Sequence, residues 1–156
     1  MTILDNTIFI VAGDNGTMTY GQGAAREEGQ AYSGSNGHWR GGLSTAFEGG
    51  MRTPAFVRYG DKVKAGQVTD EIVSDLDWFS TIARMTGNIK KVPTDRMIDS
   101  IDQSDFILGK IKKSPRNYVV QFVGKEIYAV KWNNFKFHTQ YVNTTDGPVY
   151  KPAFPL

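Results

Sequence analysis

Asp14 and Asn15 are the residues whose types and position best suit chemistry. They follow a continuous apolar run, residues 7–12, and are flanked by Gly13 and Gly16. A carboxylate beside an amide oxygen makes a pair of hard ligands, which suit Ca²⁺ or Mg²⁺ rather than softer metals. Ligands in open α/β sheets bind just past the carboxyl ends of strands. The same residues also form an ordinary turn, so a turn and a metal site remain alternatives.

The apolar run at residues 7–12 is predicted to be a strand that is buried on both faces. It is continuous rather than alternating and rich in β-branched residues, which is typical of a parallel sheet covered by helices. Because the run begins almost at Met1, we expect its neighbouring strands to belong to an amino-terminal part that this sequence lacks. A strand stripped of its sheet exposes apolar surface, so the isolated chain is expected to be poorly soluble or oligomeric.

The glycine-rich stretch from residue 13 to residue 50 is expected to be a functional loop. It has no sustained period, and long loops in compact domains are usually functional or disordered. Aromatic and charged side chains are interleaved along it, which favours function. These side chains are Tyr20, Arg26, Tyr32, His38, Trp39, Arg40, Phe47 and Glu48.

The middle of the chain predicts a short strand and a packing helix. Residues 54–59 form a strand entered through proline. Ser74 is expected to cap a helix that ends at Gly87, and a helical turn is expected over residues 104–108. The apolar positions of the helix are Leu76, Phe79, Ile82 and Ala83. The simplest interpretation of Trp78, Phe79 and Trp132 is that they belong to the core.

Three strand-like runs follow, with connections of hairpin length. They are residues 118–123, 127–132 and 135–141. In the third run Phe135 and Phe137 share one face, whereas Lys136 and His138 share the other. We expect an antiparallel meander packed on one face, with His138 exposed on its polar face. No regular element is expected after residue 141.

The composition excludes several classes of function. The 156 residues include 18 basic and 16 acidic side chains without a dense basic run, so no nucleic-acid partner is expected. The absence of cysteine excludes disulfides, thiolate metal sites and a catalytic thiol. No apolar run approaches the roughly 20 residues of a membrane span. No signal peptide is visible, and the compartment stays undetermined.

A second motif lies downstream of the Asp-Asn pair, in residues 39–54. It has the form Arg-Gly, then Thr, then Glu-Gly-Gly-x-Arg-x-Pro. Together with the Asp-Asn-Gly that follows a buried strand, it resembles the carboxyl-terminal half of the sulfatase catalytic domain. The resemblance covers most of residues 5–141 and depends on the order and spacing of its pieces. The later pieces are residues 64–66, 74–77, 98–102 and 108–110.

The resemblance implies a metal-assisted hydrolysis of sulfate esters. Sulfatases use a formylglycine made from a Cys or Ser in an amino-terminal motif, and its hydrated aldehyde attacks sulfur. A Ca²⁺ ion beside it is held by amino-terminal aspartates and by an Asp-Asn pair, which maps onto Asp14 and Asn15. The metal and cationic side chains stabilise the charged oxygens. Arg40 is a candidate for binding sulfate, since guanidinium groups bind such anions bidentately. His38 is a second candidate, although an ordinary loop role suits it as well.

Three departures from the family pattern limit this interpretation. The formylglycine motif, Cys or Ser followed by x-Pro-x-Arg, is absent, so no catalytic residue is assigned, and the amino-terminal metal aspartates are missing too. Leu43 stands where many sulfatases carry a lysine that contacts the sulfate. Either Arg40 or His38 takes this role, or the subfamily does without it.

The expected fold is therefore an α/β fragment: part of a mostly parallel sulfatase sheet, followed by a small antiparallel subdomain. Residues 1–112 are assigned to the catalytic domain and residues 113–156 to the start of the subdomain. Three functions remain open: an inactive piece of a sulfatase, a non-catalytic anion-binding remnant, and part of a related phosphoester or phosphonate hydrolase.

Two pairs of charged residues in the chain also allow structural roles. Glu48 and Arg52 lie four residues apart, where an internal ion pair is favoured over a role with substrate. Asp99 and Asp102 lie three apart, and in sulfatases they belong to a structural turn.

Overall fold

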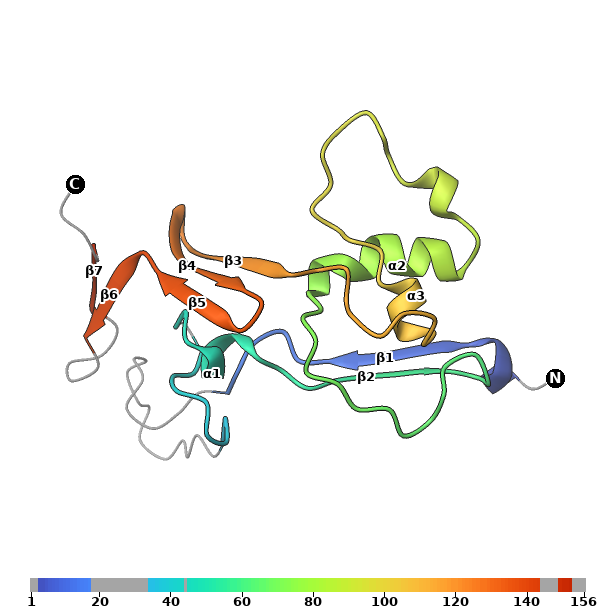
Figure 1. The fold of residues 1–156 in the computed structure, drawn as a ribbon, viewed down its shortest axis with the longest axis horizontal. Helices are drawn as coiled ribbons and strands as arrows, with labels where there is room; N and C mark the ends of the chain where they lie inside the picture. The colour runs from blue at the N-terminus through green and yellow to red at the C-terminus, as the bar shows by residue number, and fades with distance from the viewer. Residues whose placement is uncertain (1–2, 18–33, 44, 144–148, 153–156) are drawn as a thin grey trace, which may run out of the picture. The chain divides into compact units, whose positions relative to one another are not determined.

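The computed structural model describes residues 3–17, 34–43, 45–143 and 149–152 (Figure 1). Its helices are α1 (Glu48–Met51), α2 (Trp78–Met85) and α3 (Ser104–Ile107), with 3-10 turns at Ile3–Asn6, Asp75–Asp77 and Ile89–Lys91. Its strands are β1 (Ile8–Ala12), β2 (Ala55–Tyr59), β3 (Tyr118–Val123), β4 (Glu126–Trp132), β5 (Phe135–His138), β6 (Gln140–Asn143) and β7 (Val149–Pro152). The chain forms two compact units. The first comprises residues 1–11 and 55–118, and the second residues 12–54 and 119–156.

The strands form three small sheets, in the orders β1-β2, β3-β4-β5 and β6-β7. β1 and β2 run in opposite directions (Figure 1), and the pairs β4-β5 and β6-β7 are antiparallel. The mixed α/β character and the small antiparallel sheets are confirmed. No two of the described strands pair in parallel, so the predicted parallel sheet is not seen in this chain.

β1 occupies the predicted positions, but the prediction that both its faces are buried is wrong. Phe9 and Val11 are 40% and 63% exposed, and Phe56 on β2 is 67% exposed. A two-stranded ribbon has no further strands beside it and no complete cover over either face. The β-branched composition of the run therefore reports its strand preference and not its burial.

Ser74 is confirmed as a cap, and the element that it caps is the 3-10 turn Asp75–Asp77, which leads directly into α2. The Ser74 side chain accepts a hydrogen bond from the backbone N–H of Leu76, and Asp77 accepts one from the N–H of Ser74, which together make a capping box. The helical turn expected near residue 104 is also present as α3.

The apolar positions of this helical region are not core residues. Leu76, Phe79 and Ile82 are 58%, 55% and 39% exposed, so the predicted packing of this face is wrong. Trp132 is also exposed. The side chains that α2 buries are small and polar, Ser80 and Thr81, because they face the polar network described next.

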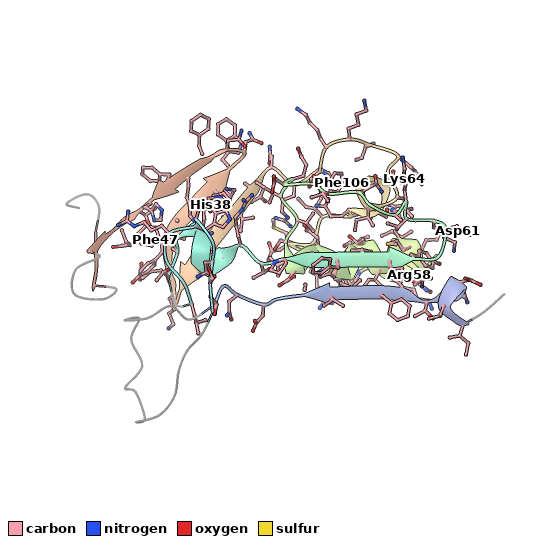
Figure 2. The ribbon with its side chains drawn as sticks, turned by 90° about the horizontal axis from the view of Figure 1, so that it is seen from below. His38, Phe47, Arg58, Asp61, Lys64 and Phe106 are labelled. Atoms are coloured by element: carbon pink, nitrogen blue, oxygen red, sulfur yellow. The ribbon has the colours of Figure 1, made fainter. Side chains whose placement is uncertain are left out.

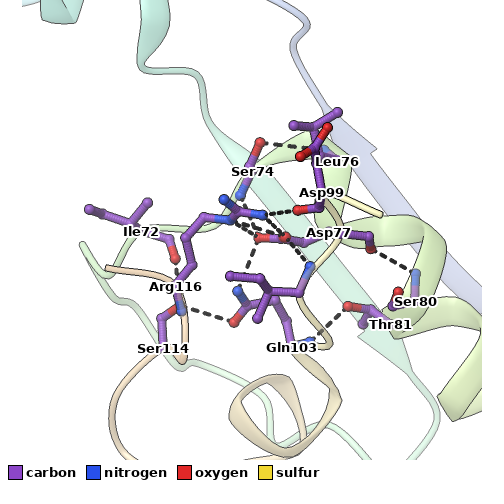
Figure 3. A network of polar contacts seen from close by, with 12 residues as sticks. Ile72, Ser74, Leu76, Asp77, Ser80, Thr81, Asp99, Gln103, Ser114 and Arg116 are labelled. Atoms are coloured by element: carbon purple, nitrogen blue, oxygen red, sulfur yellow. Dashed lines mark hydrogen bonds and ion pairs between the residues drawn. The ribbon is translucent and has the colours of Figure 1, made fainter. Parts of the chain in front are cut away.

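A buried ion pair between Asp77 and Arg116 organises the first unit (Figure 3). The Arg116 Nε donates to both carboxylate oxygens at 3.0 and 2.8 Å, and its Nη2 donates to Oδ1 at 2.6 Å. The same Nη2 donates to the carbonyl oxygen of Asp99 at 2.6 Å. Both side chains are almost fully inaccessible to solvent. This pair ties the start of α2 to the segment that precedes β3.

Polar side chains around the pair satisfy the remaining lone pairs of the carboxylate. Asp77 also accepts from the backbone N–H of Ile101 and from Nε2 of Gln103. Burial raises the pKa of Asp77, but the hydrogen bonds from Arg116, the two backbone amides and Gln103 outweigh it, so the pKa lies below its ordinary value. Asp102 accepts from the backbone N–H of Ser104 and pairs with Arg84, contacts of the kind expected in a structural turn.

The carboxyl-terminal strands differ from the predicted meander in two ways. The run at residues 135–141 is interrupted at Thr139, so that β5 pairs with β4 and β6 pairs with β7, an element that was not expected. In addition, Phe135 and Phe137 are 74% and 55% exposed, whereas the Lys136 side chain is only 11% exposed. The polar face is the covered one, and the predicted packing of the apolar face is wrong.

Replacing Asp77 by asparagine should destabilise the first unit by about 3–5 kcal/mol, because it leaves the buried guanidinium of Arg116 without a counter-charge. Urea unfolding monitored on the first unit measures this loss. The control is Asp95→Asn, which breaks the exposed Asp95–Arg96 pair and should have no measurable effect. Equal stability of Asp77→Asn and the parent chain would contradict the role given to the buried pair.

The exposed apolar side chains of β1 and β2 should make the isolated chain self-associate. The double change Phe9→Ser and Phe56→Ser should lower the weight-average mass in light scattering toward that of a monomer. The control Lys64→Ser, at an exposed polar position, should leave the mass unchanged. A chain that is monomeric before any substitution would refute this expectation.

Candidate functional site

Asp14 and Asn15 lie in an exposed turn that directly follows β1. The backbone N–H of Asn15 donates to Oδ1 of Asp14 at 2.9 Å, and Nδ2 of Asn15 donates to the carbonyl oxygen of Gly16 at 3.0 Å. Oδ2 of Asp14 and the side-chain oxygen of Asn15 accept no hydrogen bond from any described residue. Two hard oxygen atoms are therefore available on the surface of this turn.

Close backbone packing against α1 fixes this turn. The N–H of Gly16 donates to the carbonyl oxygen of Gly50 at 2.9 Å. A Cβ atom on Gly16 would lie 1.7 Å from the carbonyl oxygen of Gly49, so only glycine permits the contact. The N–H of Gly49 in turn donates to the carbonyl oxygen of Arg40 at 2.8 Å. The Gly49–Gly50 pair thus holds both the Asp-Asn turn and the Arg40 segment.

The side chain of Asn36 links two backbone segments of the glycine-rich stretch, a role that the sequence did not indicate. Its side-chain oxygen accepts from the N–H of Thr17 at 2.9 Å, and its Nδ2 donates to the carbonyl oxygen of Gly41 at 2.9 Å. The N–H of Leu43 donates to the carbonyl oxygen of Thr17 at 3.1 Å. The two ends of the glycine-rich stretch are therefore tied together. Tyr20, Arg26 and Tyr32 lie outside the described residues.

The candidate substrate residues Arg40 and His38 are both exposed. The guanidinium of Arg40 lies over the ring of Phe47, 4.4 Å from its centroid, and the ring of His38 lies 4.2 Å from that of Trp39. Figure 2 shows the side chains of His38 and Phe47. Leu43 is half-buried. These contacts orient Arg40 and His38 but leave them accessible to an anion.

Among the described carboxylates of the second unit, Glu48 has the most ion-pair partners. It accepts from Nζ of Lys131 at 2.7 Å and from Nζ of Lys136 at 2.9 Å, and Nε of Arg52 lies 3.4 Å away. The predicted pair with Arg52 is confirmed, but the two lysines, from distant strands, lie closer. Burial raises the pKa of Glu48, yet the hydrogen bonds and charges of the lysines outweigh it and lower the pKa overall.

The ion pair between Glu48 and Lys136 lowers the pKa of the carboxylate but does not raise that of the ammonium group above its ordinary value. Burial, together with the like charge of Lys131, lowers the pKa of Lys136 below its ordinary value although Glu48 raises it. Both ammonium groups are shielded from water, and the negative charge of Glu48 offsets the free-energy cost of their burial.

His138 is half-buried, so the prediction that it is simply exposed is wrong. Its ring centroid lies 5.2 Å from that of Phe47, and its buried Nδ1 atom has no hydrogen-bond partner among the described residues. Burial lowers the pKa of His138, and the charges of Lys136 and Arg40 lower it further, against a smaller opposing effect of Glu48. The folded chain therefore favours the neutral imidazole.

The described residues fit part of a metal site rather than a whole one. They contain no group of three or more His, Asp or Glu side chains that are placed to hold an ion. Asp14 and Asn15 offer two oxygen atoms of the type that Ca²⁺ binds, whereas Ca²⁺ takes six to eight. The donor chemistry suits two members of a larger ligand set. Within the described part of the chain, no helix is long and apolar enough to cross a membrane.

Comparison with known proteins shows which family this chain belongs to. The family described as Sulfatase matches residues 2–88, which include the Asp-Asn turn and α1. Human (Homo sapiens) steryl-sulfatase is 35% identical over 126 residues, which is 76% of this chain and 21% of the relative. N-acetylgalactosamine-6-sulfatase of Rattus norvegicus is 36% identical over 137 residues, or 87% of this chain and 24% of the relative.

A solved structure supports the same assignment. The PsFucS1 sulfatase from Pseudoalteromonas sp. aligns with 97% of this chain and 30% of its own length, with 29% identity and a TM-score of 0.78. The chain belongs to the sulfatase family, a family of hydrolases. It spans only about a fifth to a quarter of the length of the curated relatives named above.

Acidification should destabilise the second unit through His138. The folded-state pKa of His138 is depressed, so the folded form binds fewer protons than the unfolded form, and stability falls as the pH drops below about 6.5. Urea unfolding of the second unit between pH 8 and pH 5 measures this slope.

The matched variants use the only two histidines of the chain. His138→Phe should flatten the slope between pH 8 and pH 5, whereas His38→Gln, at an exposed position, should retain it. A slope that survives His138→Phe unchanged would exclude His138 as its cause.

Proposed function

We propose that this chain is the carboxyl-terminal part of a sulfatase catalytic region and that Asp14 and Asn15 are two ligands of its Ca²⁺ ion, with Mg²⁺ as an alternative metal. The observation that carries the proposal is the exposed Asp-Asn turn, whose two oxygen atoms are free of other described partners and which lies within the region matched by the family. A bound divalent cation would supply charge stabilisation for the oxygens of a sulfate group.

The substrate would be a sulfate ester, bound in part by this chain's cations. Arg40 and His38 are exposed on a segment whose backbone is tied to the same glycine pair as the Asp-Asn turn. The guanidinium group of Arg40 suits two oxygens of a sulfate group. Leu43 cannot donate a hydrogen bond to an anion. Arg40 and His38 are therefore the candidates for the sulfate contact that a lysine makes at this place in many sulfatases.

The domain assignment follows from the same proposal. Residues 1–112 would belong to the catalytic domain, and residues 113–156 would begin a small antiparallel subdomain. β1 would join the mostly parallel sheet of a longer protein, which would cover its exposed Phe9 and Val11. The formylglycine nucleophile would come from the amino-terminal part of that protein, so the isolated chain would be inactive.

In the full-length gene product, Asp14→Ala and Asn15→Ala should each lower kcat/KM for 4-nitrophenyl sulfate and weaken retention of Ca²⁺, by about 10- to 100-fold. Stopped assays and metal analysis after dialysis measure the two effects. Asp70→Ala, at an exposed position of the first unit, is the control and should change neither.

The results of these assays distinguish the proposed sulfatase function from its two alternatives. Normal activity and metal retention in both variants would refute the ligand assignment. A full-length product that binds sulfate but never hydrolyses its esters would instead support an anion-binding remnant. Hydrolysis of phosphate esters or phosphonates in preference to sulfate esters would support a relative with a different substrate.

A further inference from the structure

Glu48 joins three segments that are distant in the sequence. It is the first residue of α1, Lys131 lies on β4 and Lys136 lies on β5. Lys131 and Lys136 are directly opposite each other in the antiparallel pair, so their side chains leave the same face of the sheet. The carboxylate therefore receives both ammonium groups at once, at 2.7 and 2.9 Å.

The three side chains are well shielded from water. Glu48 and Lys131 are each 17% exposed, and Lys136 is 11% exposed. Two like charges that face each other across a strand pair destabilise it, and a shielded cation without a counter-charge is costly. Glu48 cancels this repulsion only while α1 stays against the sheet. The charge pairing therefore holds α1 in one position.

The position of α1 in turn sets that of the Asp-Asn turn. Gly16 donates to the carbonyl oxygen of Gly50, two residues beyond Glu48. Gly16 packs so closely that a Cβ atom would lie 1.7 Å from the carbonyl oxygen of Gly49. The turn cannot keep this hydrogen bond if α1 shifts. The ion pairs of Glu48 thus connect β4 and β5 to α1, and the Gly16–Gly50 hydrogen bond connects α1 to the Asp14–Asn15 turn.

We propose that Glu48 is a positioning residue that acts through α1, and that its pairing with Lys131 and Lys136 fixes the Asp14–Asn15 turn in the arrangement needed to bind a divalent cation. The metal part of this inference rests on the proposed function. The mechanical part, in which Glu48 fixes the turn, does not.

Amide hydrogen exchange in the ¹⁵N-labelled chain tests the mechanical part. Glu48→Gln keeps the shape of the side chain and removes its charge, and it should speed exchange at the Gly16 amide by at least about tenfold. The control Glu126→Gln removes an exposed glutamate from β4 and should leave that rate unchanged. An unchanged Gly16 rate in Glu48→Gln would overturn the inference.

A triple variant separates positioning from a general loss of stability. Glu48→Gln combined with Lys131→Gln and Lys136→Gln removes the repulsion between the lysines as well as the carboxylate. The Thr139 amide, which donates to the carbonyl oxygen of Tyr128 at 3.0 Å, reports on the sheet. In the triple variant, fast exchange at Gly16 with normal exchange at Thr139 would support the role of Glu48 in positioning the turn. Equal acceleration at both amides would show that Glu48 merely stabilises the unit.

A titration of the full-length gene product with CaCl₂ tests the metal part separately, through the chemical shift of the Asn15 side-chain amide. We expect a saturable shift in the unsubstituted protein and an apparent affinity about tenfold weaker in its Glu48→Gln variant. No shift in the unsubstituted protein would count against the metal-ligand role of Asn15, while the Gly16 exchange rates still decide the mechanical part. Equal affinities for Ca²⁺ in the two proteins would overturn the coupling of Glu48 to the metal.

Discussion

The close approach of Gly16 to the Gly49–Gly50 pair is the constraint on which the candidate site depends. Backbone atoms touch there without any intervening side chain, so the Asp-Asn turn and the Arg40 segment share a single support. Glycine is the only residue that permits such contact. The glycines of the Glu-Gly-Gly motif are therefore a packing requirement of the site.

Each compact unit is built around a shielded carboxylate rather than a large apolar core. Asp77 in the first unit and Glu48 in the second both receive cations from segments far along the chain. In both cases the cations hold the net pKa of the carboxylate below its ordinary value although burial opposes this. Such pairs are costly to break, so they fix which segments meet even where apolar packing is sparse.

Apolar packing is sparse in the described part of the chain. Few large apolar residues are buried there, and many are exposed on β1, β2 and the helical region at residues 75–85. The chain corresponds to about 30% of the aligned sulfatase structure. Under the proposed function, the rest of a longer protein would cover these apolar faces.

The sequence by itself determined the local elements and the family. The β-branched run before Asp14, the Ser74 cap and the turns that join β3, β4 and β5 depend on neighbouring residues, and their element types were predicted correctly. Burial was decided only by the tertiary structure, because it depends on which distant segments cover a face. Alternation in residues 135–138 could not reveal that Glu48 would draw Lys136 inward and leave Phe135 and Phe137 in solvent. The two lysines that pair with Glu48, the Arg116 that pairs with Asp77 and the Phe47 ring beside His138 likewise lie dozens of residues away, where spacing along the chain carries no signal.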